Sequence, residues 1–151
     1  MNDPVAILKR DHREVAAMLR TLEDSKPGAR RRSTVQKLVA ALELHMEIEE
    51  RDVYPVVSRV VGKEEATEAG VEHRLAREGL QELQRLVDEP GFGAAVAMLT
   101  AGIRHHVKEE EQEVFPELKR RISRDELRDL GDRVAAAKKP ARRSTSRGRA
   151  A

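Results

Sequence analysis

Residues 42–55 read LELHMEIEERDVYP, and residues 103–116 read IRHHVKEEEQEVFP. Each stretch places a histidine four residues before a glutamate and ends in an aromatic residue followed by proline. The two pairs are His45 with Glu49 and His106 with Glu110. Residues four apart lie on one face of a helix. Each stretch therefore predicts a helix that directs an imidazole and a carboxylate the same way.

The two stretches belong to an internal repeat with a shift of 61 residues, which also superposes His12 on His73. Hydrophobic positions follow the same shift. The matched pairs include Leu19 and Leu80, Leu22 and Leu83, Leu38 and Leu99, Leu42 and Ile103, and Val53 and Val114. We therefore expect two related helical hairpins about a pseudo-twofold axis.

Hydrophobic residues recur every three or four positions through four long segments. These run from Val5 to Leu22, Val35 to Val56, Ala66 to Val87 and Val96 to Leu118. This period, with short loops containing Pro and Gly, is typical of an up-down-up-down four-helix bundle. Pro55 and Pro116 fall inside helical patterns, where proline kinks or ends a helix.

We expect an all-α fold with three parts. Residues 1–122 form an up-down-up-down four-helix bundle. A short fifth helix, capped by Ser123, spans residues 123–137 on or beside the bundle. Residues 138–151 hold six basic side chains and no acid, and we expect a disordered basic tail there.

Composition excludes several other classes. Charged residues make up 37% of the 151 residues and aromatic residues 2%, which suits helices with charged outer faces better than a β-sandwich. The chain has no cysteine, which excludes disulfides, thiolate catalysis and cysteine metal sites. No stretch approaches the roughly 18 apolar residues of a membrane span, and the first residues have no apolar signal core. We expect a cytoplasmic protein with no membrane partner.

Each of the four segments places one histidine on its inward-facing stripe, and two add a glutamate. The six side chains are His12, His45, Glu49, His73, His106 and Glu110. A single inward histidine is ordinarily a core residue satisfied by a neighbouring carbonyl or carboxylate. Burying two carboxylates costs several kcal/mol each unless they are paired or bound to a cation. Because all six residues obey one repeat, we predict a metal site in preference to a cluster of protonated histidines and carboxylates.

The donor set restricts the metal. Nitrogen and carboxylate donors without sulfur favour iron, manganese, zinc or copper over calcium or magnesium. Six donors exceed the four of a closed zinc site. The repeat relates Glu49 to Glu110, so each is placed to bridge two ions about 3.5–4 Å apart, with two histidines for each ion.

These residues give the chain a resemblance to the hemerythrin family, in particular to bacterial HHE cation-binding domains. The resemblance covers residues 3–120 and rests on His12 in DHREV, His73 in EHR and the two stretches quoted above. It implies a left-handed four-helix bundle that holds two iron ions, bridged by carboxylates and by an oxo or hydroxo group. It also implies that the six side chains above are the iron ligands, and that the centre reacts with O2, H2O2 or NO.

One departure from the family pattern affects the expected activity. Oxygen-carrying hemerythrins have a second histidine on the third helix, four residues after the first, where this chain has Arg77. Arginine stays protonated and cannot bind a metal, so we expect an additional position open to water or substrate. This favours catalase-like disproportionation of peroxide, sensing of O2 or NO, or iron handling over reversible O2 transport.

Other residues have less specific interpretations. Glu50 and Glu111 are interpreted as surface charges, with hydrogen bonding to a ligand histidine as the alternative. Tyr54 and Phe115 are expected to pack at the bundle end, with Tyr54 as a ligand or redox residue the alternative. His105 is rotated by about 100° from its neighbour on the helix and is not expected to bind metal.

The functional hypotheses remain three. In the first, a monomer reacts with a small diatomic or peroxide ligand at a di-iron centre. In the second, the same centre is a sensing or iron-handling module without turnover. In the third, the metal is structural and the basic tail binds nucleic acid through phosphate contacts. A tail that only aids solubility is favoured over that third function.

Overall fold

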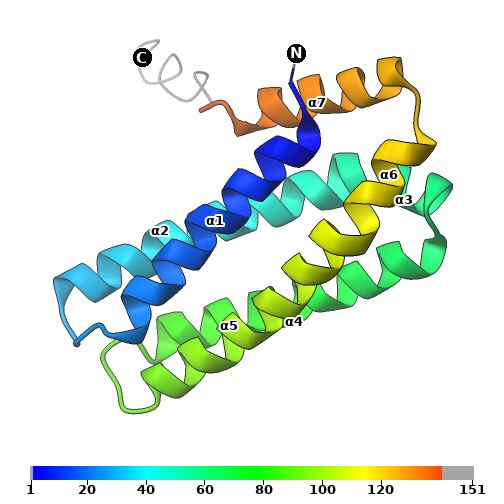
Figure 1. Cartoon of the computed structure of the whole chain (residues 1–151). Coiled ribbons are helices and arrows are strands. Elements are labelled where there is room, and N and C mark those ends of the chain that lie inside the picture. The colour runs from blue at the N-terminus through cyan, green and yellow to red at the C-terminus, as the bar shows by residue number, and fades with distance from the viewer. Residues whose placement is uncertain (1, 141–151) are drawn as a thin grey trace, which may run out of the picture.

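The computed structural model describes residues 2–140, and all regular secondary structure within this range is helical (Figure 1). In chain order the elements are α1 (Pro4–Glu23), α2 (Ala29–Ile48), the π-helix η1 (Glu49–Val53), α3 (Tyr54–Val60), α4 (Lys63–Arg85), α5 (Phe92–Glu109), the π-helix η2 (Glu110–Val114), α6 (Phe115–Arg121) and α7 (Arg124–Lys138). The prediction of an all-α fold is confirmed. The predicted tail lies outside the described residues from residue 141 onward. None of the helices between residues 2 and 140 has the length and apolar character needed to span a membrane.

The four long helices lie side by side in two hairpins. In each hairpin, consecutive helices pack on each other, α1 on α2 and α4 on α5. The hairpins meet through contacts of α1 with α5 and of α2 with α4 (Figure 1). The last helix, α7, packs mainly against α1 and also reaches η1. The two hairpins therefore enclose one interior, and α7 covers part of it.

Helix starts follow the local sequence. The Asp3 side chain accepts a hydrogen bond of 2.9 Å from the Val5 amide, and Pro4 occupies the first turn of α1, where its missing N–H leaves no donor unsatisfied. At the start of α7, the Ser123 hydroxyl accepts a hydrogen bond of 3.1 Å from the Glu126 amide. The predicted serine cap is thus present, and α7 continues to Lys138.

Both inward-facing glutamates begin a π-helical turn. η1 starts at Glu49 and η2 starts at Glu110, and each ends directly before the aromatic–proline pair. Proline has no N–H for the regular helical hydrogen bond, and its ring clashes with the preceding turn. A wider turn relieves this conflict, and such π turns occur frequently at functional sites. The regular α-helix therefore ends before Pro55 and Pro116, as predicted, while the chain continues in helical form.

The hydrophobic core consists of two clusters with a polar layer between them. On α1, Leu8 belongs to one cluster and Val15 to the other, and His12 lies between them. The same order holds from α2 into η1, where Leu42 and Val53 belong to different clusters. The predicted polar side chains therefore lie in the middle of the helices, enclosed by apolar packing on both sides.

Candidate metal centre

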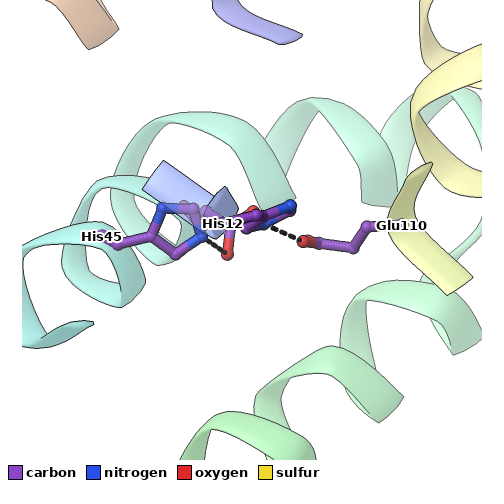
Figure 2. Close-up of side chains that lie close together, drawn as sticks. His12, His45 and Glu110 are labelled. Carbon is purple, nitrogen blue, oxygen red and sulfur yellow. Dashed lines mark ion pairs between the residues drawn. The ribbon is translucent and has the colours of Figure 1, made fainter. Parts of the chain in front are cut away.

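The six predicted side chains come together in this polar layer. All six are buried, and Glu49 is fully enclosed. Their donor atoms form two groups, each with atoms within 4.8 Å of one another. One group contains His12, His45, Glu49 and Glu110, and the other contains Glu49, His73 and His106. Figure 2 shows His12 between His45 and Glu110, which approach it from other helices.

The distances reproduce the pseudo-twofold symmetry of the sequence. Each glutamate faces one histidine of its own hairpin and one of the other hairpin. Oε1 of Glu49 lies 3.1 Å from Nε2 of His45 and 3.2 Å from Nε2 of His73. Oε1 of Glu110 lies 3.4 Å from Nε2 of His106 and 3.3 Å from Nε2 of His12. The two carboxylates are therefore placed between the two pairs of imidazoles.

A carboxylate also lies at the opposite ring nitrogen, Nδ1, of every one of the four histidines. The pairs are His12 with Glu111 at 2.7 Å, His45 with Asp11 at 2.9 Å, His73 with Glu50 at 2.7 Å, and His106 with Glu72 at 2.6 Å. A carboxylate at Nδ1 fixes the ring orientation and leaves Nε2 available to a metal. The interpretation of Glu50 and Glu111 as surface charges was wrong, because both bind histidines of the centre.

The interior of the centre fits a cation. Nε2 of His12 and His45, Oε2 of Glu49 and Oε1 of Glu110 are buried without a hydrogen-bond partner among residues 2–140. The 3.1 Å approach of His45 to Glu49 does not have hydrogen-bond geometry. Buried polar groups are almost always paired, so this concentration of unpaired donor atoms needs an explanation. A metal ion bound between them supplies it.

The electrostatics agree with this assignment. Burial would lower the pKa of His45, but the carboxylates of Glu49 and Asp11 raise it to about 10. Burial likewise opposes the charge on His106, whereas Glu110 and Glu49 raise its pKa to about 12. In turn, the imidazoles of His45 and His106 hold the pKa of Glu49 well below its usual range, against the effect of burial. In the metal-free protein, protons therefore occupy nitrogens that a metal would need.

Tyr54 lies in the centre, whereas the sequence interpretation favoured packing at the bundle end, with a role at the metal only as the alternative. Its hydroxyl lies 2.7 Å from Oε2 of Glu110, 3.0 Å from Nε2 of His73 and 3.2 Å from Nε2 of His106. Burial and the nearby carboxylates raise the pKa of Tyr54 well above its usual value. The sequence contains a signal for this role. The internal repeat aligns Tyr54 with Phe115, and the two residues differ only by the hydroxyl group of Tyr54.

Arg77 and His105 both lie outside the centre. The guanidinium of Arg77 donates hydrogen bonds of 2.8 and 3.0 Å to Glu50 and one of 3.2 Å to Glu43. Arg77 therefore supports the carboxylate that binds His73. The His105 side chain is 65% exposed, and its Nε2 lies 3.0 Å from Glu109 and 3.3 Å from Glu72, the carboxylate that also contacts His106.

The fold and these side chains define a helical domain with a buried histidine–glutamate site for cations. The chain belongs to the hemerythrin HHE cation-binding domain family, whose model matches residues 3–118. It is similar to the crystal structure of a hemerythrin HHE cation binding domain-containing protein from Mycobacterium kansasii, with a TM-score of 0.77 and 27% identity over 90% of this chain and 84% of that chain. A comparison with curated proteins finds no match. The predicted family resemblance is confirmed.

Proposed function

We propose that this protein is a non-haem di-iron protein, built as an up-down-up-down four-helix bundle, that reacts with H2O2, O2 or NO. Catalase-like disproportionation, in which two H2O2 give two water molecules and one O2, is the leading activity. The observation that carries the proposal is the position of Glu49 and Glu110 between two pairs of imidazoles. A site shared in this way fits two ions better than one.

The six side chains that would hold the iron are His12, His45, Glu49, His73, His106 and Glu110. Iron bound there would supply a Lewis acid and two electrons for a small oxidant. The four Nδ1 carboxylates keep each imidazole in the orientation and tautomer that direct Nε2 inward. The Tyr54 hydroxyl, 2.7 Å from Glu110, can hold or transfer a proton at that carboxylate, or bind the second ion as a phenolate.

The alternative is a sensing module that uses the same centre without turnover. One contact supports the sensing module, because it connects the metal centre to α7. Lys138 of α7 donates a hydrogen bond of 2.7 Å to Asp11, and the other oxygen of Asp11 lies 2.9 Å from Nδ1 of His45. A change at the centre would therefore reach α7 through one carboxylate.

Metal analysis and an absorption spectrum of the iron-reconstituted protein test the di-iron assignment. We expect about two irons per chain, as a carboxylate-bridged pair requires, with near-ultraviolet bands of an oxo-bridged pair. His106→Gln should reduce the iron content, and Arg104→Gln, a change at an exposed position of the same helix, should not. Iron content that is equal in both variants would contradict the assignment.

Mixing the iron-loaded protein with H2O2 in a stopped-flow instrument, with an oxygen electrode in parallel, tests the activity. O2 evolution is expected. If neither O2 nor a spectral change appears, the catalase-like function is rejected. Limited proteolysis of the diferrous and diferric forms then tests the sensing alternative, which requires that cleavage around α7 differ between the two forms.

A further inference from the structure

A large apolar cavity lies between α4 and α5 and reaches the metal centre. Its volume is about 880 Å³, and its inner wall includes His45, His73 and His106. Its outer edge includes Leu75 and Met98, whose side chains are 58% and 75% exposed. Together with Val71, these are the large hydrophobic side chains exposed in the part of the chain that the structure describes. The cavity therefore joins an apolar surface to the centre.

The cavity exists because α4 and α5 face each other with small residues. Ala76 and Gly79 of α4 and Gly102 of α5 line it. In the first hairpin, the repeat places the larger Val15 at the position of Ala76. At Gly79 a Cβ would lie 2.9 Å from the Leu99 side chain, so this glycine allows α4 and α5 to approach closely, whereas a Cβ at Gly102 meets nothing within 4 Å.

The size and chemistry of the cavity identify the class of its occupant. A water molecule takes about 30 Å³ in the liquid, so H2O2 or a diatomic gas would leave nearly all of this volume empty. Cavities of roughly 300–1,000 Å³ with apolar walls bind organic molecules. Among the described residues that line it there is no lysine or arginine, and the acids are Glu72 and Glu82. The lining therefore favours a neutral molecule with an apolar body.

We propose that this cavity binds the apolar body of an organic hydroperoxide, R–O–OH, with its O–O bond directed at the imidazoles of the centre. The proposal rests on the proposed di-iron function and names a substrate class for it. Ferrous iron held by the six side chains of the centre would supply two electrons and become ferric, and these electrons with two protons would break the O–O bond. The products are R–OH and water.

Gly102→Leu introduces a side chain at the lining of the cavity without disturbing the helix. A Cβ added at Gly102 meets no heavy atom within 4 Å, and leucine favours a helix more than glycine does. Gly70→Leu is the matched control, because Gly70 is an exposed glycine of α4 with equally open space around a Cβ and lies outside the cavity lining.

The binding test uses zinc-loaded protein, which has no redox activity. The neutral dye N-phenyl-1-naphthylamine and its displacement by cumyl alcohol report occupancy of the cavity. We expect wild type and Gly70→Leu to bind the dye, and Gly102→Leu to weaken both ligands by about tenfold or more, as added methylenes do in a filled apolar pocket. Equal binding by all three proteins, or none by wild type, would overturn the proposal.

The kinetic test compares cumene hydroperoxide with H2O2 on ferrous protein. The ratio of the two rates should fall about tenfold in Gly102→Leu and stay constant in Gly70→Leu. If the ligands bind as expected but neither peroxide reacts, the di-iron function fails while the cavity site stands. If H2O2 reacts but the ratio is unchanged, the hydroperoxide proposal is overturned.

Sedimentation tests whether a second copy of the chain covers the opening of the cavity. If the protein forms a dimer that excludes the dye, and Leu75→Gln dissociates this dimer, the proposal is also overturned.

Discussion

Tyr54 and Phe115 occupy equivalent positions of the two hairpins, and only Tyr54 carries a polar atom into the metal centre. The Tyr54 hydroxyl lies 2.7 Å from Oε2 of Glu110. Phe115 instead stacks on His12, with ring centroids 6.1 Å apart and an interplanar angle of 9°. One oxygen atom therefore makes the two halves of a nearly symmetric site chemically different.

Tyr54→Phe should lower the number of protons released on metal binding. Burial raises the pKa of Tyr54, so the phenol is protonated in the metal-free protein, and binding as a phenolate would release that proton. Calorimetry in two buffers of different ionisation enthalpy measures the count. We also expect metal affinity to fall about tenfold, while Arg104→Gln, at an exposed position of α5, retains the wild-type values. Equal proton counts in wild type and Tyr54→Phe would mean that the hydroxyl does not bind the metal.

Arg77→Leu should weaken metal binding although Arg77 does not touch the centre. Its guanidinium binds both oxygens of Glu50, and Glu50 lies 2.7 Å from Nδ1 of His73. Without the arginine, Glu50 is free to turn toward water and His73 loses its orientation. A loss of about tenfold in metal affinity is expected, measured by competition with a chelator. Arg74→Leu, at an exposed position on the same helix, is the control, and an equal effect there would exclude this route.

The position of the metal centre could be predicted from the sequence because it follows the helical period. His45 and Glu49 are four residues apart on an apolar stripe, so any helix that buries the stripe buries both side chains. The carboxylates at Nδ1 were harder to identify. Glu50 and Glu111 each lie one residue beyond the apolar stripe of their own helix, a position that predicts exposure to solvent. The histidine that each one contacts belongs to another helix, so the pattern of a single helix does not reveal the contact.

Other features depend on packing that the sequence pattern does not specify. The repeat matches Asp11 with Glu72, but nothing in that match indicates which histidine each one binds. Lys138 belongs to α7, which lies outside the repeat, so its contact with Asp11 had no counterpart to predict it. The cavity between α4 and α5 arises from small residues such as Gly102, which in a sequence are compatible with close helix packing as well as with open space.

The metal-free protein should lose stability as the pH rises. The folded pKa of His45, about 10, lies above the ordinary value of 6.5 for an imidazole. Its stabilising contribution is therefore complete below pH 6.5 and is lost between pH 6.5 and about 10. The pKa of Glu49 is lowered, so its contribution is lost only below the ordinary carboxyl value of 4.5. The melting temperature of the metal-free protein should fall from pH 7 to pH 10, and His45→Gln should flatten that slope. A slope unchanged by the substitution would contradict this origin.

Gly131→Ala should destabilise the fold by separating α7 from the N-terminus. A Cβ at Gly131 would overlap with the backbone carbonyl of Asn2 and crowd the ring of Pro4. Because backbone cannot rotate away as a side chain can, we expect a loss of about 1–3 kcal/mol in the free energy of unfolding. Gly70→Ala, where the Cβ meets nothing within 4 Å, should instead gain roughly 0.5–1 kcal/mol. Urea denaturation of both variants measures the difference. Equal free energies of unfolding for Gly131→Ala and Gly70→Ala would show that α7 can shift to accommodate the added methyl group without cost.

Lys138→Met should alter the half of the metal centre that contains His45. Burial would raise the pKa of Asp11, but hydrogen bonds from His45 and Lys138 lower it, so Asp11 is a carboxylate held by both. Removing the lysine leaves a buried carboxylate, 4% exposed, with the imidazole as its remaining partner among the described residues. Asp11 would then be less firmly positioned against Nδ1 of His45, the ring orientation that directs Nε2 inward would be loosened, and metal affinity should fall by about tenfold.

Lys139→Met provides the matched control for Lys138→Met, since it removes the same charge one residue further along, at an exposed position after the end of α7. Titration of each metal-free variant with ferrous or zinc ions in the presence of a competing chelator gives the affinity. If net charge alone were responsible, both variants would weaken binding equally, and the loss would disappear at high salt. A loss confined to Lys138→Met that persists at high salt identifies the contact of Lys138 with the buried Asp11–His45 pair, because buried and partly buried pairs are screened much less than surface charges.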